Sequence, residues 1–149
     1  MKALLQRVTH ASVSVAGDIV GEIDKGLLVF LGLDKGDNQD SAERMLDKLL
    51  AYRVFGDDQG RMNNNVVEAA GGVLLVSQFT LSADTRKGLR PSFSSALPPA
   101  EAEALYHYTL QALQHRHSPV AAGRFGADMQ VALVNDGPVT FWLQVNPPQ

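Results

Sequence analysis

The run Leu27–Leu31 is apolar at every position. Such a run is expected of a central strand that is covered on both faces, because a strand with one wet face would alternate apolar and polar side chains. Residues 11–15 do alternate in this way, and Gly17-Asp18 then offers a turn into residues 19–23. The N-terminal third therefore predicts a hairpin followed by the middle strand of a sheet.

The hydrophobic pattern then changes to a helical period. Apolar residues fall at helical spacing over residues 39–53, with Asn38 or Asp40 available as the N-cap. A second helix is predicted after Pro98-Pro99, because proline suits the first turn of a helix. The buried stripe expected on this second helix consists of Ala102, Leu105, Tyr106, Leu110 and Leu113.

Further strands are predicted at residues 73–76 and over residues 129–145. The latter alternate on both sides of Asn135-Asp136-Gly137-Pro138, which predicts that the chain ends in a hairpin. Strand hairpins with helices inserted between them favour an α+β fold. We therefore expect a single domain over residues 1–149, in which mainly antiparallel β-sheets form a barrel-like core covered by two main helices.

Composition narrows the classes of function. The 149 residues carry 13 Lys and Arg against 16 Asp and Glu, and this net charge of -3 argues against a partner held by whole-protein charge, such as bulk nucleic acid. The sequence has no cysteine, which excludes disulfides, thiolate zinc sites and a cysteine nucleophile and is compatible with a reducing cytosol. No stretch approaches the ~18 apolar residues of a membrane helix, and Gln6 and Arg7 interrupt any signal-like start. We expect a cytoplasmic protein without a membrane segment.

Several common catalytic motifs are missing from the sequence. There is no Gly-rich phosphate loop before a helix, no His-Glu-x-x-His motif and no Gly-x-Ser-x-Gly elbow. His115 and His117 could supply half of a metal site, but a charged helix end explains them better. We therefore expect no metal and no cofactor.

Polar side chains mark the end of the buried strand at residues 73–76. Two hydroxyls and an amide at a strand end can bind a polar ligand, and backbone N–H groups there can face an oxyanion. A strand that simply ends in β-forming residues would explain the same composition. The candidate site residues are Ser77, Gln78, Phe79 and Thr80.

The following residues, 82–97, form a long segment without periodicity, and loops of this length tend to be functional. This segment carries the basic residues Arg86, Lys87 and Arg90. A further candidate is Gly137-Pro138, which could be only a turn. If its peptide bond is cis, the carbonyls of Gly137 and Pro138 would point to one side and could clamp an ammonium group.

Four motifs resemble, in order and spacing, the D-aminoacyl-tRNA deacylases of the bacterial and eukaryotic type. The motifs are Ser77–Leu81, Lys87–Phe93, Gly123–Met129 and Asn135–Thr140. The resemblance covers essentially the whole chain, since Gln6-Arg7-Val8 also looks like that family.

This resemblance implies a homodimer that hydrolyses the ester between a D-amino acid and the terminal adenosine of tRNA. It implies that residues 77–80 line the pocket and that Gly137-Pro138, as a cis dipeptide, enters the pocket of the partner subunit. Rejection of L side chains there would leave D-aminoacyl-tRNA and glycyl-tRNA as substrates. Arg86, Lys87 and Arg90 would then contact the acceptor end of the tRNA.

Thr80 leaves two mechanisms open. Its hydroxyl could attack the ester, or it could orient the substrate while the ribose 2′-OH of the tRNA assists. We favour the second, because no general base accompanies Thr80 in its motif. Two other functions compete: a non-catalytic RNA-binding module that uses the basic segment, and a small-molecule esterase, which would need a base such as His10 near Thr80 or Ser77.

Overall fold

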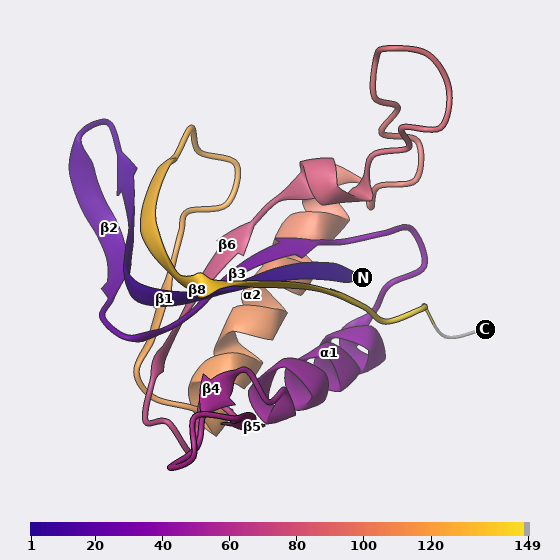
Figure 1. Ribbon diagram of the computed structural model, residues 1–149. Helices are drawn as coiled ribbons and strands as arrows, with labels where there is room; N and C mark the ends of the chain where they lie inside the picture. Colours follow the sequence, from indigo (N-terminus) through magenta and orange to yellow (C-terminus); the bar gives the residue numbers. More distant parts are fainter. Residues whose placement is uncertain (148–149) are drawn as a thin grey trace.

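The computed structural model describes residues 1–147. Figure 1 shows a strongly curled sheet with two helices lying together against one of its faces. Along the chain the elements are β1 (Lys2–Val15), β2 (Asp18–Ile23), β3 (Gly26–Gly32), α1 (Gln39–Ala51), β4 (Phe55–Gly56), β5 (Met62–Asn64), β6 (Gly72–Ser77), the 3₁₀ helix η1 (Phe79–Ser82), α2 (Pro99–Arg116), β7 (Val120–Ala122) and β8 (Gln130–Gln144).

The main sheet has the order β2-β1-β3-β6-β7. β2 and β3 pair with different parts of the same edge of β1, and β8 pairs with the opposite edge. All the pairs that β1 makes are antiparallel, whereas β3–β6 and β6–β7 are parallel. The ends of the sheet curl toward each other, since a Cβ on Gly21 of β2 would lie 2.4 Å from the Ala122 carbonyl oxygen of β7. The expected α+β fold with a barrel-like sheet and two main helices is confirmed.

The apolar run Leu27–Leu31 lies in β3, between β1 and β6. Leu27, Val29 and Leu31 face the helices, while Leu28 faces a second cluster inside the curled sheet. The strand is covered on both faces, so the prediction of a central strand is confirmed.

Both predicted helices form where their caps and periodicity place them. Asn38 is the N-cap of α1, and its side chain and that of Ser41 form a reciprocal capping box. On α2, Leu110 is only partly buried, and Thr109 occupies the buried stripe instead. The buried Thr109 hydroxyl has a hydrogen-bond partner within the helix, because it donates to the Leu105 carbonyl at 2.7 Å. Within residues 1–147, neither helix is long and apolar enough to cross a membrane.

The predicted C-terminal hairpin is wrong. β8 continues through the Asp-Gly signal as one strand and pairs along its length with β1. Asn135 lies opposite Val8 and Thr140 lies opposite Gln6, so residues 136–139 bulge out against Arg7. β1 is 14 residues long and offers one edge to both halves of β8, which makes a reversal of the chain unnecessary.

Candidate functional site

The candidate segment Ser77–Thr80 begins where β6 ends. Ser77 lies opposite Leu31 in the parallel β3–β6 pair, and the Gln78 N–H donates to the Leu31 carbonyl at 2.8 Å. The chain then turns into η1, whose first N–H groups have no partner within the helix. The strand that leads into this segment is buried along its length up to Val76.

Within the segment, the Gln78 side chain holds Thr80. The Gln78 Nε2 group donates to Thr80 Oγ1 at 2.5 Å. Thr80 and Phe79 are exposed, with 61% of Phe79 accessible, so these two side chains point outward. The Phe79 ring packs against the Phe93 ring at a centroid separation of 5.0 Å. The four predicted residues therefore lie on one turn, where Phe79 and Thr80 are exposed and Ser77 and Gln78 are half-buried.

Gly32, which the sequence reasoning did not single out, supports this patch from below. A Cβ at Gly32 would lie 2.8 Å from Leu81 Cβ and 3.1 Å from Ser82 Oγ. Ser82 is buried, and its hydroxyl donates to the Leu33 carbonyl at 3.1 Å. The end of β3 thus sets the position of η1, and only a residue without a side chain fits at Gly32.

Gly137 and Pro138 lie on the bulge of β8, and the peptide bond between them is cis. Both residues are exposed. Arg7 holds the base of the bulge: its Nε group donates to the Asp136 carbonyl at 3.1 Å, and its NH1 group donates to the Val54 carbonyl at 2.7 Å. In the sequence, Arg7 stands out only as part of a motif similar to the deacylases, because nothing local links it to a segment 129 residues away.

Within residues 1–147, no hydrogen bond or ion pair joins the bulge to the segment Ser77–Thr80. The bulge faces solvent in the single chain, and its hydrogen bonds go to β1 and to its own strand. The two candidate groups are therefore each well formed, and each is open on its outer side.

The basic residues Arg86, Lys87 and Arg90 lie on the exposed loop after η1. Arg86 is bound to the carboxylate of Asp84, and these hydrogen bonds hold the pKa of Asp84 well below its usual range. Lys87 and Arg90 make no hydrogen bond or ion pair with the described part of the chain.

Within the described residues, no histidine is hydrogen-bonded to the segment Ser77–Thr80. His10 Nε2 lies 3.0 Å from Glu22 Oε2. His117 Nε2 lies 2.7 Å from the Gly71 carbonyl oxygen. Among residues 1–147, no three or more His, Asp or Glu side chains are grouped as a metal site.

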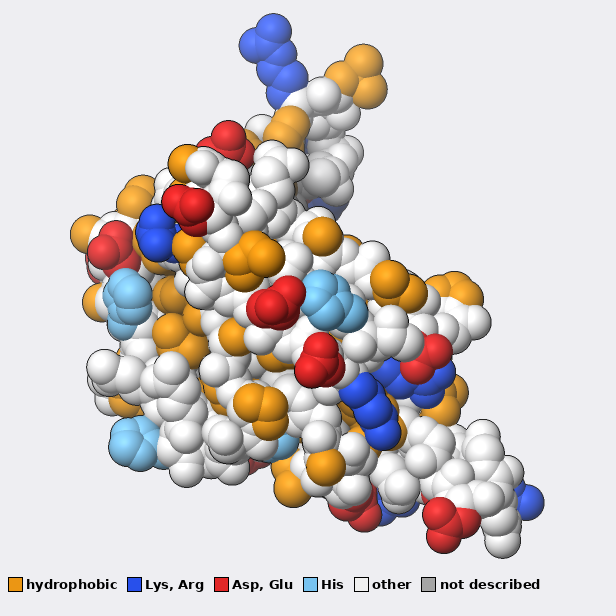
Figure 2. All heavy atoms as spheres, turned by 90° about the vertical axis from the view of Figure 1, so that its left-hand side faces the viewer, with side chains coloured by type: hydrophobic (Ala, Val, Ile, Leu, Met, Phe, Trp, Pro, Cys, Tyr) orange, Lys and Arg blue, Asp and Glu red, His pale blue; other side chains and the backbone are white. Residues whose placement is uncertain are grey.

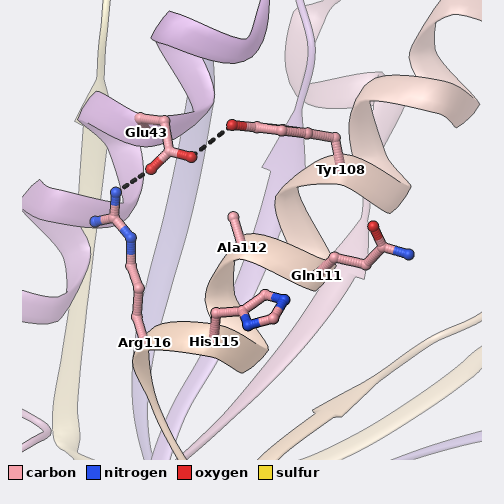
Figure 3. Close-up of a pocket in the computed structure, with 6 residues that line it drawn as sticks. All are labelled: Glu43, Tyr108, Gln111, Ala112, His115 and Arg116. Atoms are coloured by element: carbon pink, nitrogen blue, oxygen red, sulfur yellow. Dashed lines mark hydrogen bonds and ion pairs between the residues drawn. The ribbon is translucent and has the colours of Figure 1, made fainter.

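A separate pocket of about 330 Å³ lies between α1 and α2 (Figure 3). Glu43 points between Tyr108, whose hydroxyl donates to it at 2.6 Å, and Arg116, which also binds Asp47. The Tyr108 hydrogen bond, together with Arg116, lowers the pKa of Glu43. These contacts tie the helices together and involve none of the residues at the end of β6.

Comparison with known proteins places this arrangement in context. The sequence model of the family described as D-Tyr-tRNA(Tyr) deacylase matches residues 4–144. A protein named D-aminoacyl-tRNA deacylase from Stutzerimonas stutzeri is 64% identical, covering 97% of this chain and 99% of the relative. A second protein of that name, from Saccharophagus degradans, is 62% identical, covering 96% of this chain and 99% of the relative.

Solved structures agree with the fold. The structure titled "c-Myc DNA Unwinding Element Binding Protein" has a TM-score of 0.94 and 42% identity, covering 98% of this chain and 99% of that one. A second, titled "Structural Analysis of a probable eukaryotic D-amino acid tRNA deacylase", has a TM-score of 0.83, covering 97% and 98%. At 16% identity, this second likeness shows the fold alone.

Proposed function

Since the chain belongs to the D-Tyr-tRNA(Tyr) deacylase family, it is an ester hydrolase that acts on D-aminoacyl-tRNA, and we propose that it rejects L-aminoacyl-tRNA through Gly137-Pro138 and also cleaves mischarged glycyl-tRNA. The observation that carries the proposal is the exposed Gln78–Thr80 pair at the end of β6, which is held in place without a basic side chain. Ser77 and Phe79 complete the proposed pocket on the same turn.

Hydrolysis of this ester needs little from the protein beyond placement. An aminoacyl ester is already reactive, so positioned water and backbone N–H groups of Phe79 and Thr80 that face the developing oxyanion can supply most of the acceleration. Thr80 orients the substrate, and the ribose 2′-OH of the tRNA assists the attack. The absence of a base from the hydrogen bonds of Thr80 among residues 1–147 supports this assignment.

Selection between D- and L-amino acids takes place at Gly137-Pro138. The carbonyls of Gly137 and Pro138 fix the α-amino group of the substrate and crowd one side of its Cα, where an L side chain collides and a D side chain does not. Glycine has no side chain to reject, so glycyl-tRNA is accepted. The Arg7 contacts at the base of the bulge support this role, because they hold the segment in one position.

The site is completed by a second copy of the chain. Gly137-Pro138 is exposed, as are Phe79 and Thr80, so in a homodimer the bulge of one subunit can enter the pocket of its partner. The acceptor end of tRNA lies along Arg86, Lys87 and Arg90, and the enzyme works in the cytoplasm. It uses no cofactor in this proposal.

Ester loss from three substrates tests the proposal: D-tyrosyl-tRNA, L-tyrosyl-tRNA and glycyl-tRNA. We expect cleavage of the first and third and protection of the second. Fully resistant glycyl-tRNA would contradict rejection as the source of chirality. Cleavage of both tyrosyl enantiomers, or of small free esters, would indicate a general esterase instead.

A nucleic-acid-binding function is the second candidate, because the 42% identical relative carries a title that names DNA binding. It requires the exposed basic loop but not the Gln78–Thr80 pair. Binding of DNA or tRNA with no loss of ester from any of the three substrates would favour this candidate.

A further inference from the structure

The loop of residues 84–92 stands out from the body of the protein beyond η1 (Figure 1). Its base is closed by two backbone hydrogen bonds between Asp84 and Ser92, at 2.7 and 3.0 Å. Below this closure, the Ser95 hydroxyl donates to the Ser82 carbonyl at 2.7 Å. The loop is therefore a closed finger fixed to the end of η1.

The tip of the finger exposes an apolar side chain. Leu89 is the most exposed large hydrophobic residue within residues 1–147, at 104% of its reference area, and it follows Gly88, whose φ of +66° makes the turn. The projecting tip carries basic and hydrophobic side chains together at the top of Figure 2. Removal of an apolar side chain from water is favourable, so a partner that covers Leu89 would be stabilised by that contact.

The three cations of the finger are not equivalent. The Arg86 guanidinium binds both carboxylate oxygens of Asp84, at 2.9 and 2.8 Å, which neutralises it and braces the loop. Lys87 and Arg90 have no such partner in the described part of the chain. Two uncompensated positive charges therefore flank Leu89.

The finger is joined to the candidate site through one aromatic contact. The Phe93 ring, just after the closure, packs on Phe79 at 5.0 Å between centroids. About four residues of extended chain separate the closure from the tip, a reach of ~13 Å. This maximum reach is comparable to the length of about four stacked nucleotides. The tip is therefore within range of the nucleotides next to a terminal adenosine bound at Thr80.

We propose that this finger binds the single-stranded 3′ end of tRNA, with Lys87 and Arg90 on its phosphates and Leu89 against the face of a base. The inference rests on the proposed function and adds a contact upstream of the ester. Single-stranded nucleic acid offers both chemistries at this spacing, because each nucleotide carries one phosphate and one flat apolar surface. Arg86 is a positioning residue for the loop.

The test compares two substrates that carry the same ester: D-tyrosyl-tRNA and D-tyrosyl-adenosine, which lacks the upstream nucleotides. For Leu89→Ser we expect kcat/KM on the tRNA to fall about fivefold, mainly through KM, and a much smaller change on the adenosine ester.

For Lys87→Gln combined with Arg90→Gln, the slope of log kcat/KM against log salt should decrease in magnitude by about 1.4 on the tRNA. Met62→Ser and Lys48→Gln, exposed changes on β5 and α1, are the matched controls and should leave both substrates unchanged.

Failure of the two proposals can be told apart. If neither substrate is cleaved by the wild-type protein, the proposed function fails. If both are cleaved and the loop variants match the wild type on tRNA, the finger does not bind the 3′ end. Loss of dimers in Leu89→Ser, measured by sedimentation, or Leu89-dependent binding to anionic lipid vesicles with unchanged tRNA kinetics, would assign the tip to another partner and overturn the inference.

Discussion

The oxygen of the Thr80 hydroxyl accepts a hydrogen bond from Gln78, and no basic side chain is bonded to Thr80 among residues 1–147. A hydroxyl nucleophile normally depends on such a base. The substrate carries its own hydroxyl next to the ester, on the ribose. The chemistry can therefore be divided, with the protein holding the ester in place and the RNA supplying the reactive assistance.

Removal of the Thr80 hydroxyl should accordingly be tolerated. We expect Thr80→Ala to keep kcat on D-tyrosyl-tRNA within about tenfold of the wild type, because it loses orientation and not a nucleophile. D-tyrosyl-tRNA that ends in 2′-deoxyadenosine should react at least about 100-fold more slowly with the wild-type protein. Single-turnover rates measure both effects. An unchanged 2′-deoxy rate together with an inactive Thr80→Ala would identify Thr80 as the nucleophile.

Gly137 has a backbone that excludes a side chain. Its φ is +129°, and a Cβ there would lie 2.7 Å from Val139 Cγ2 and 3.1 Å from Arg7 NH2. Gly137→Ala should shift the bulge and lower kcat/KM on D-tyrosyl-tRNA by about tenfold or more. Gly60→Ala is the matched control, since Gly60 has a φ of +77° but no atom within 4 Å of its Cβ position. Equal kinetics for the two variants would show that the bulge is only a structural feature.

The sequence singles out the candidate residues Ser77–Thr80 but not the residues that support them. Ser77–Thr80 could be found because polar residues interrupt an apolar run at a strand end, which is a local signal. Gly32 and Arg7 could not, because their importance comes from neighbours distant in the sequence, Leu81 and Asp136 respectively. A single glycine in a strand, or a single arginine on one, has no local pattern that predicts such contacts.

At the level of elements, β8 shows that strand pairing can override a local turn signal. Asp-Gly with Pro beside it is a strong hairpin signal, and the alternating residues on both sides fit two strands as well as one. The uninterrupted edge of β1 pairs with both halves, so the signal produces a bulge in place of a reversal. The helices and central strand were predicted correctly because their periodicity and caps agree with their packing.

The contact between β3 and η1 makes a prediction at the same scale. Gly32→Ala places a methyl group 2.8 Å from Leu81 Cβ, which is closer than these atoms can approach, so η1 must shift. We expect kcat on D-tyrosyl-tRNA to fall about tenfold with a smaller change in KM, because the displaced η1 carries Thr80. Gly56→Ala, where nothing lies within 4 Å, is the control. A Gly32→Ala protein with normal kcat and a lowered Tm would limit Gly32 to a role in packing.

For the molecule as a whole, the contact between α1 and α2 predicts a pH dependence of stability. The pKa of Glu43 is lowered below its ordinary value of 4.5, first by the Tyr108 hydrogen bond and then by Arg116. Its contribution is therefore present above pH 4.5 and is lost as the pH falls through the lower pKa of the folded state. We expect Glu43→Gln to lower Tm by about 1–3 °C at pH 7, since the group is partly exposed, and to match the wild type at low pH.

Thermal unfolding of both proteins between pH 3 and pH 7 measures this difference. Glu103→Gln is the control, because Glu103 makes no side-chain hydrogen bond within residues 1–147 and lies on α2, the helix that carries Tyr108 and Arg116. A Tm difference for Glu43→Gln that persists unchanged to pH 3 would mean that the contact acts through packing and not through charge.

The proposed dimer has a consequence that a single chain cannot reproduce. Gly32→Ala displaces η1 at the pocket and Gly137→Ala shifts the bulge, so each homodimer is expected to keep about a tenth or less of the wild-type activity. If the bulge enters the partner's pocket, a heterodimer of the two variants has one site in which both groups are intact, and its activity should be about half that of the wild type. Co-expression with two different affinity tags and tandem purification gives this heterodimer. If the bulge served its own pocket, every site would carry one defect and no activity would return, and a failure to recover both tags together would argue against a dimer.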